Sequence, residues 1–329
     1  MSGAQSGLPF ALPGALLVAG PTASGKSALA LDLAERFDGV VINADSMQLY
    51  AELRVLTARP TAAEERRVPH RLYGVRPAAA AASVAWWRGE ALAAMGAARA
   101  AGRLPILCGG TGLFFHSLTQ GLSAIPAVPD AARAEARGLL AAEGPETLHA
   151  RLAAADPETA ARLRPGDSQR VARAWEVWRG TGRGLAAWQR EGASTGPVPW
   201  RLAAILLDPP RDGLRAAIAA RFAAMLRQGA IEEVRGLLAQ GLDPALPAMR
   251  AHGVPELAAH LAGRMTLAAA AERAILNTGQ YTKRQRTWFR HHALAAPPDM
   301  HMIHARYAEG AQFQESGREE IFAFVDSRR

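Results

Sequence analysis

Lysine and cysteine are nearly absent from this chain of 329 residues. Lys26 and Lys283 are the two lysines among 38 basic residues, so almost every other positive charge is an arginine. The single cysteine, Cys108, permits neither an internal disulfide nor a zinc site with four cysteine ligands. No apolar stretch is long enough to span a membrane, and residues 1–13 lack the basic start of a secretory signal. We therefore expect a cytoplasmic protein that does not enter a membrane.

The composition is that of a folded protein with a positive charge. Hydrophobic residues make up 49% of the chain, which is ample for a core, and the length allows one large α/β domain with an insertion, or two domains. A net charge of +8 favours polyanions, and phosphate-rich ligands are the natural candidates. Because arginine usage also follows the overall composition, the charge alone is weak evidence for a nucleic acid partner.

The most informative pattern is a glycine-rich segment with the spacing of a phosphate-binding loop. Its eight residues are Gly20, Pro21, Thr22, Ala23, Ser24, Gly25, Lys26 and Ser27. They follow the apolar run 15–19 and precede a helical pattern from Ala28, which is the strand–loop–helix context that the motif requires. In such a loop, backbone N–H groups and the helix N-terminus bind phosphate oxygens. Lys26 would add a positive charge, and the Ser27 hydroxyl would bind Mg²⁺.

Strand and helix patterns alternate through the first part of the chain. Apolar runs at 15–19, 40–42 and 104–108 predict strands, and a helical pattern covers 84–101. Such alternation predicts a parallel sheet with crossover helices. Each predicted strand ends in a small or polar loop. Because ligands of open α/β sheets bind at the carboxyl ends of strands, we expect these loops to converge.

The pattern changes between about residues 128 and 192, where no strand pattern remains. Helix starts recur there at Asp130, Asp156 and Asp167. We expect an all-helical insertion at 125–198, bounded by proline-rich stretches, within a core made of 14–124 and 199–292. Strand character returns at 202–207, and helices then dominate to about Arg290. Residues 293–329 are expected to form a C-terminal tail, in which no chemistry is recognisable.

Two of the predicted loops carry candidate polar groups. Asp45 follows the second strand, where its carboxylate can act as a hydrogen-bond acceptor or general base, or can cap a short helix. Physical arguments alone do not separate these roles. After the third strand, the segment 109–112 allows the backbone to approach a ligand, and Thr111 supplies a hydroxyl. A tight turn that needs positive φ explains these glycines equally well.

Arginines mark three further segments. Arg221 lies at i+7 from Leu214 on an otherwise apolar helical stripe, so it must pair with a structural carboxylate or reach an anionic ligand. Arg170 and Arg173 share a helix face, and the segment 283–290 mixes cations with aromatic residues in a way that suits an RNA backbone and a stacked base. A solvated basic face over a packed apolar face is the other explanation for both segments.

Taken together, these motifs resemble those of the tRNA dimethylallyltransferases, also called tRNA isopentenyltransferases. The matching segments run in family order over about residues 14–291, at 20–27, 45–50 (Asp-Ser-Met-Gln-Leu-Tyr), 57–60 (Thr-Ala-Arg-Pro), 69–72 (Pro-His-Arg-Leu), 109–113 (Gly-Gly-Thr-Gly-Leu), 169–173 (Gln-Arg-Val-Ala-Arg) and 283–288 (Lys-Arg-Gln-Arg-Thr-Trp). The combination is far more specific than any one of them. The resemblance implies an α/β fold with a P-loop NTPase-like parallel sheet flanked by helices, and the helical insertion.

The resemblance implies transfer of a dimethylallyl group from dimethylallyl diphosphate to N6 of the adenine just 3′ of a tRNA anticodon. The loop 20–27 would then hold the diphosphate leaving group, whose charge Lys26, Arg221 and Ser27 with Mg²⁺ would neutralise. Thr22 would lie near the bridging oxygen, and Asp45 would accept the proton of the exocyclic amine. The adenine must leave its stack to enter such a site.

The family pattern also implies tRNA contacts along the chain. These positions are Asp45, Ser46, Met47, Gln48, Thr111, Arg133, Gln169, Arg170, Val171, Ala172, Arg173, Arg250, Lys283, Arg284, Gln285, Arg286, Trp288 and Arg290. The helical insertion would clamp the anticodon stem-loop, and the protein is expected to act as a monomer. The chain departs from the family at Val254 and Pro255, where Tyr-Arg is usual, at Arg59, where lysine is usual, and at Leu56, where glycine is common.

Two other functions fit parts of the sequence. A small-molecule kinase would use ATP at the same loop, but the chain has no obvious adenine-binding or lid arginine cluster, and the segments 45–50 and 283–285 do not belong to that class. An RNA-binding module with a vestigial phosphate loop is the second alternative. The intact Lys26 and Ser27 argue against it.

Overall fold

The computed structural model describes residues 14–191, 195–307 and 315–328 of the chain. It divides into a smaller compact unit at residues 120–197 and a larger unit made of the rest. The sequence had placed the insertion at 125–198, of which residues 192–194 lie outside the described part. No helix in the described part is long and apolar enough to cross a membrane.

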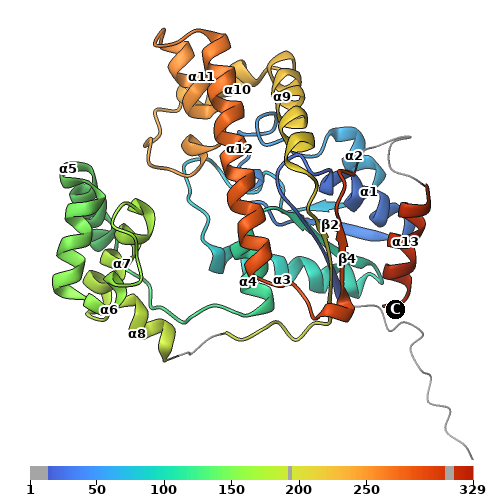
Figure 1. The fold of residues 1–329 in the computed structure, drawn as a ribbon, viewed down its shortest axis with the longest axis horizontal. Coiled ribbons are helices and arrows are strands. Elements are labelled where there is room, and N and C mark those ends of the chain that lie inside the picture. The colour runs from blue at the N-terminus through green and yellow to red at the C-terminus, as the bar shows by residue number, and fades with distance from the viewer. Residues whose placement is uncertain (1–13, 192–194, 308–314, 329) are drawn as a thin grey trace, which may run out of the picture. The chain divides into compact units, whose positions relative to one another are not determined.

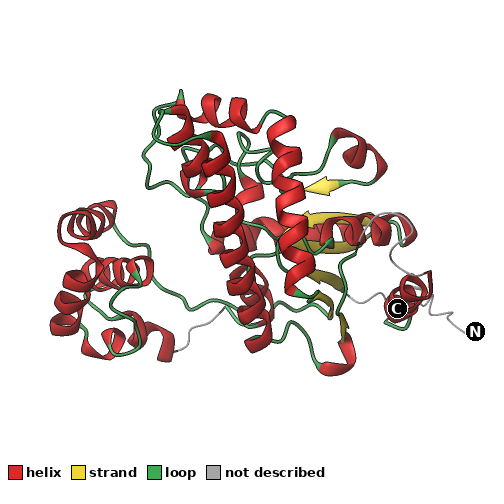
Figure 2. Ribbon diagram, turned by 45° about the horizontal axis from the view of Figure 1, so that its top comes forward, coloured by secondary structure: helices red, strands yellow, loops and turns green. Residues whose placement is uncertain are grey.

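The larger unit is built on a six-stranded sheet in which every neighbouring pair is parallel (Figures 1 and 2). In spatial order the strands are β3 (His70–Arg71), β2 (Gly39–Asn43), β4 (Leu104–Gly109), β1 (Ala15–Ala19), β5 (Leu202–Leu207) and β6 (Met300–Ile303). The predicted parallel sheet is confirmed, and its four central strands are the four apolar runs of the sequence. The two edge strands were not predicted, because they are short and mix polar with apolar residues.

Helices cover both faces of this sheet. Leu17 of β1 points into a core shared with α3 (Val84–Ala100), α4 (Gly112–Thr119) and α12 (Leu267–His291). Its neighbours Leu16 and Val18 point into a second core, against α1 (Lys26–Arg36) and α13 (Glu315–Asp326). Burial on both faces explains why the central strands are continuous apolar runs.

A third core lies among the helices that follow β5. The helices are α9 (Arg211–Arg227), α10 (Ala230–Leu238), α11 (Val254–Leu261) and the first half of α12, which gather at one end of the unit (Figure 1). Two departures from the family pattern belong to this core. Val254 is 1% exposed, and Leu56 packs so closely over Gly253 that a Cβ there would lie 2.8 Å from its Cδ2 atom. Both substitutions therefore serve apolar packing.

The remaining short elements of the larger unit lie in the connections. They are α2 (Ala62–Arg67) and the 3₁₀ turns η1 (Met47–Leu49), η2 (Ala248–Arg250) and η3 (Pro297–Asp299). The segment expected to be a separate tail is part of this unit. In its described residues, β6 extends the sheet beside β5, and Ile321 and Val325 of α13 are buried in the second core, while residues 308–314 and 329 lie outside the described part.

Within the described residues of the smaller unit, the regular elements are all helices, as the sequence predicts. It contains α5 (Asp130–Ala155), α6 (Pro157–Ala160), α7 (Ser168–Thr181) and α8 (Leu185–Arg190). The predicted start at Asp156 is a true N-cap, because its carboxylate accepts the Thr159 N–H at 3.2 Å. Asp167 caps α7 in the same way. Within α5, Gly144 has a φ of 79° and precedes Pro145, which bends the helix at that point.

Candidate functional site

The glycine-rich segment forms the expected strand–loop–helix turn between β1 and α1. Gly25 has a φ of 91°, and a Cβ at this position would lie 1.7 Å from the carbonyl oxygen of Tyr307, so only glycine fits. Lys26 is 9% exposed, and its Nζ donates to the carbonyl of Pro21 at 3.4 Å. Burial lowers the pKa of Lys26, whereas the charge of Asp45 opposes this shift. An anionic ligand in the loop would therefore stabilise the ammonium form of this lysine.

Gln285 of α12 connects this loop to the loop after β4. Its Oε1 accepts the Thr22 N–H at 2.9 Å and the Thr22 hydroxyl at 3.3 Å, while its Nε2 donates to the Gly110 carbonyl at 2.9 Å. A Cβ at Gly110 would lie 2.2 Å from Nε2. The two loops therefore converge, as predicted, and a side chain that is 4% exposed braces them. The sequence had assigned Gln285 to tRNA, but in this geometry its amide faces the protein.

Asp45 lies at the carboxyl end of β2 in a fixed orientation. Its backbone N–H donates to Oδ1 of the fully buried Asn43 at 2.8 Å, and the Asn43 Nδ2 donates back to the Asp45 carbonyl at 2.9 Å. The Asp45 Oδ1 accepts the Met47 N–H at 3.0 Å, so the carboxylate does cap the short turn η1. Within the described residues no hydrogen bond to Oδ2 is present, which leaves this oxygen for a ligand. The capping role and the acceptor role are thus compatible.

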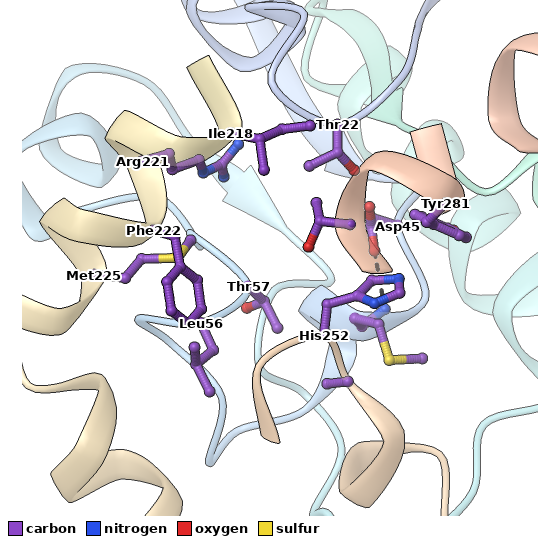
Figure 3. Close-up of a pocket in the computed structure, with 13 residues that line it drawn as sticks. Thr22, Asp45, Leu56, Thr57, Ile218, Arg221, Phe222, Met225, His252 and Tyr281 are labelled. Carbon is purple, nitrogen blue, oxygen red and sulfur yellow. Dashed lines mark hydrogen bonds between the residues drawn. The ribbon is translucent and has the colours of Figure 1, made fainter. Parts of the chain in front are cut away.

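Asp45 lines a pocket that combines polar groups with an apolar wall (Figure 3). Its polar groups include Thr22, Asp45, Arg221 and His252. The large side chains of the apolar wall are Leu56, Phe222 and Met225, which belong to the third core, and Ile218 of α9. Such a pocket suits a ligand with a small hydrocarbon group next to a charged or polar one.

A second, basic pocket lies at the phosphate loop. It is lined by Lys26 and Ser27 and by four arginines, Arg54, Arg59, Arg221 and Arg306. Arg221 lines both pockets, and no carboxylate within the described residues lies at ion-pair distance from it. Burial lowers the pKa of the Arg221 guanidinium, and Asp45 opposes that shift. Of the two explanations left open for Arg221, this geometry supports the anionic ligand.

The cations of α12 have varied environments. Arg286 is paired with Asp208 at the end of β5, and Arg290 lies 3.5 Å from the same carboxylate. Burial alone would raise the pKa of Asp208, but its hydrogen bond to Arg286 and the two positive charges outweigh burial and lower it. Asp208 is therefore paired with these two arginines. Trp288 stacks on His292 with ring centroids 4.3 Å apart and covers Gly112, where a Cβ would lie 2.2 Å from its ring.

The remaining predicted tRNA contacts divide by exposure. The exposed side chains are Arg133, Gln169, Arg170 and Arg173 in the smaller unit and Arg250, Lys283 and Arg284 in the larger one. Val171 and Ala172 are buried in the core of the smaller unit, so their side chains serve packing. Gln48 is 9% exposed and donates to the carbonyls of Thr57 and Ala58. Thr111 accepts the Ser46 N–H at 2.9 Å.

Four residues of this region were not assigned from the sequence. Asn43 orients Asp45, and the one local signal for it is its place at the end of β2, directly after the apolar run 40–42. His252 and Tyr281 line the pocket with ring centroids 4.9 Å apart. Arg306 enters the basic pocket from the C-terminal segment. No spacing in the sequence relates His252 to the other site residues.

The donor set near the loop fits a magnesium ion that is held largely by its substrate. No three His, Cys, Asp or Glu side chains in the described part could together hold a metal ion. Mg²⁺ commonly binds a few protein oxygens together with substrate phosphates and water, and the exposed Ser27 hydroxyl at the start of α1 offers such an oxygen. Cys108 is no ligand candidate, because burial raises the pKa of its thiol to about 11.

Family models and curated relatives match nearly the whole chain. Residues 48–292 match the model of the IPP transferases, and residues 13–76 match that of the isopentenyl transferases. The chain is 59% identical to a tRNA dimethylallyltransferase of Gluconobacter oxydans over 314 residues, or 95% of this chain and 94% of that protein. It is 62% identical to a tRNA dimethylallyltransferase of Gluconacetobacter diazotrophicus over 310 residues, or 94% and 93% of the two chains.

Solved structures show the same fold. The full-length tRNA isopentenylpyrophosphate transferase of Bacillus halodurans superposes with a TM-score of 0.65 at 30% identity, over 95% of this chain and 97% of that chain. A eukaryotic dimethylallyltransferase acting on tRNA has a TM-score of 0.77 at 23% identity, over 96% and 80% of the two chains, and supports the fold alone. The predicted P-loop NTPase-like α/β fold is confirmed.

Proposed function

The chain belongs to the tRNA dimethylallyltransferase family of prenyltransferases, and we propose that it transfers a dimethylallyl group from dimethylallyl diphosphate to N6 of the adenine directly 3′ of a tRNA anticodon. One observation carries this proposal. The apolar-walled pocket at Asp45 and the basic pocket at the phosphate loop meet at Arg221. Dimethylallyl diphosphate matches this arrangement, because its five-carbon chain fits the apolar-walled pocket and its diphosphate fits the basic one.

The basic pocket is suited to the diphosphate. Lys26 and Arg221 place two positive charges beside the loop, and the start of α1 directs backbone N–H groups toward it. As the bond between C1 of the prenyl group and the diphosphate oxygen breaks, its electron pair leaves with the diphosphate. Groups already oriented toward that growing charge lower the barrier, because they do not have to reorganise during the reaction.

Asp45 is suited to accept a proton from the adenine amine. The nitrogen N6 forms a bond to C1, and the proton that it loses needs an acceptor. The Asp45 Oδ2 faces the pocket, while its other oxygen and its backbone are held by Met47 and Asn43. Such anchoring keeps the carboxylate in one orientation. Thr22 is a loop residue that Gln285 holds in place and that also lines the pocket at Asp45, and we assign it to the bridging oxygen.

Mg²⁺ is part of this proposal. The Ser27 hydroxyl would hold it together with oxygens of the diphosphate, where it would neutralise charge on the leaving group. The stacked Trp288, the cations of α12 and the exposed arginines of the smaller unit are the groups that we assign to tRNA. We also propose that the protein acts in the cytoplasm and that it is a monomer. Light scattering on the purified protein would check the monomeric state.

The direct experiment uses purified protein, Mg²⁺, labelled dimethylallyl diphosphate and an anticodon stem-loop with an adenine 3′ of the anticodon. We expect label in the RNA, and no label when guanosine replaces that adenine. A small-molecule kinase would instead hydrolyse ATP in response to a metabolite and leave the RNA unlabelled. An RNA-binding module would bind the stem-loop and transfer nothing. Either outcome would remove the proposed function.

A further inference from the structure

The C-terminal segment that follows β6 runs along the outer side of the phosphate loop. The backbone N–H of Tyr307 donates to the Ser24 carbonyl at 2.9 Å, and Nε of Arg306 donates to the Ala23 carbonyl at 3.0 Å. The carbonyl of Tyr307 lies directly against Gly25. When successive N–H groups of a loop turn inward to a ligand, its carbonyls turn outward and need donors. Residues 306–307 supply two of those donors.

This segment is held firmly in place. Tyr307 is 2% exposed, and its hydroxyl donates to Oδ2 of Asp32 on α1 at 2.5 Å. Arg318 of α13 donates to the same oxygen at 3.0 Å. Burial raises the pKa of Tyr307, and Asp32 adds to this effect, so the hydroxyl remains a donor at neutral pH. Arg306 is therefore attached to a rigid backbone beside the loop.

The Arg306 side chain uses one of its donors on the protein. Its Nε binds the Ala23 carbonyl, and within the described residues Nη1 and Nη2 have no hydrogen-bond or ion-pair partner. The side chain lines the basic pocket together with Lys26, Ser27 and Arg221. A guanidinium fixed at Nε presents its two amino groups as a planar pair, and such a pair matches two oxygens of a phosphate.

We propose that Arg306 is a further diphosphate-binding residue, held at the phosphate loop by the Ala23 carbonyl and the Tyr307 anchor. This inference rests on the proposed function. Arg306 would be a diphosphate-binding residue outside both the glycine-rich motif and α9. Arg306 would bind the diphosphate within the basic pocket, whereas Arg221 lines both pockets and lies at the junction with the apolar-walled one.

The test measures binding of inorganic pyrophosphate with Mg²⁺ by calorimetry, without RNA or prenyl group. We expect Arg306→Ala to weaken binding roughly tenfold or more, the size of one charge-assisted contact. Arg264→Ala is the matched control, because it removes the same charge from an exposed position. Arg264 lines none of the pockets described above. It should leave the affinity unchanged. In transfer assays, Arg306→Ala should raise the KM for dimethylallyl diphosphate while the KM for tRNA stays constant.

A second variant separates a ligand from a simple brace. Arg306→Lys keeps a phosphate-binding charge but loses both the planar pair of amino groups and the Nε bond to the loop, so we expect an affinity between those of the wild type and Arg306→Ala. If the lysine variant is as weak as the alanine variant, or if Arg306→Ala binds normally, Arg306 is no diphosphate ligand and the proposed function stands. If the wild type binds no pyrophosphate and transfers no label, both proposals fail together.

Discussion

Replacing Gln285 by glutamate tests how the two loops of the site are coupled. The carboxylate of Gln285→Glu can still accept the Thr22 N–H, but it has no donor for the Gly110 carbonyl, and Gly110 is buried. Leaving a buried carbonyl without its hydrogen-bond donor costs about 1–3 kcal/mol. We therefore expect the free energy of unfolding to fall by about 1–3 kcal/mol. The new negative charge beside the phosphate loop should also weaken pyrophosphate binding at least tenfold.

Two assays measure these effects, urea unfolding and calorimetric titration with pyrophosphate and Mg²⁺. Gln280→Glu is the matched control, because it places the same charge on an exposed position of α12, and it should change stability by less than about 0.5 kcal/mol. If Gln285→Glu unfolds at the wild-type urea concentration and binds pyrophosphate normally, Gln285 does not couple the loops. Loss of stability with normal binding would limit its role to packing.

Three further substitutions have defined outcomes. Arg221→Gln should lower kcat/KM for dimethylallyl diphosphate by roughly 10–100-fold with unchanged tRNA affinity, because one charge-assisted contact to the diphosphate is lost; an equal loss of tRNA affinity would contradict this. Gly112→Ala should destabilise the fold by about 1–3 kcal/mol in urea unfolding, because its Cβ would overlap the Trp288 ring. Its control is Gly138→Ala, where a Cβ meets nothing within 4 Å. Asp208→Asn should cost about 1–3 kcal/mol at neutral pH, because its two arginines lose their partner. Since the folded pKa of Asp208 lies below its ordinary value of 3.8, its contribution is present above that pH and lost as pH falls through the folded pKa, so the difference from the wild type should shrink in acid.

The sequence predicted the central sheet because burial on both faces leaves an unmistakable pattern. Strands β1, β4 and β5 are continuous apolar runs that helices cover on both sides. The edge strand β6 and the docking of α13 depend on contacts with distant parts of the chain. No local pattern in Met300–Ile303 distinguishes an edge strand from a loop.

Site residues that belong to a short sequence motif or a single helix could be predicted from the sequence. Those that depend on contacts between distant parts of the chain could not. The phosphate loop is a contiguous motif, and Asp45 and Arg221 were found from a strand end and a helical stripe. The brace through Gln285 spans 263 residues of sequence to Thr22, and the contact of Arg306 with Ala23 spans 283. Long separations of this kind leave no periodicity or spacing in the sequence.

The central claim is that Asp45 accepts the proton of the adenine amine next to a diphosphate that the phosphate loop holds. The most direct measurement is the single-turnover rate of label transfer from bound dimethylallyl diphosphate to the anticodon stem-loop, in the wild type and in Asp45→Asn. The asparagine can still accept the Met47 N–H, so the turn η1 should persist while the proton acceptor is lost. We predict a rate about 10²–10⁴-fold lower, with pyrophosphate affinity unchanged. A near-normal rate in Asp45→Asn would contradict the claim and leave Asp45 as a cap.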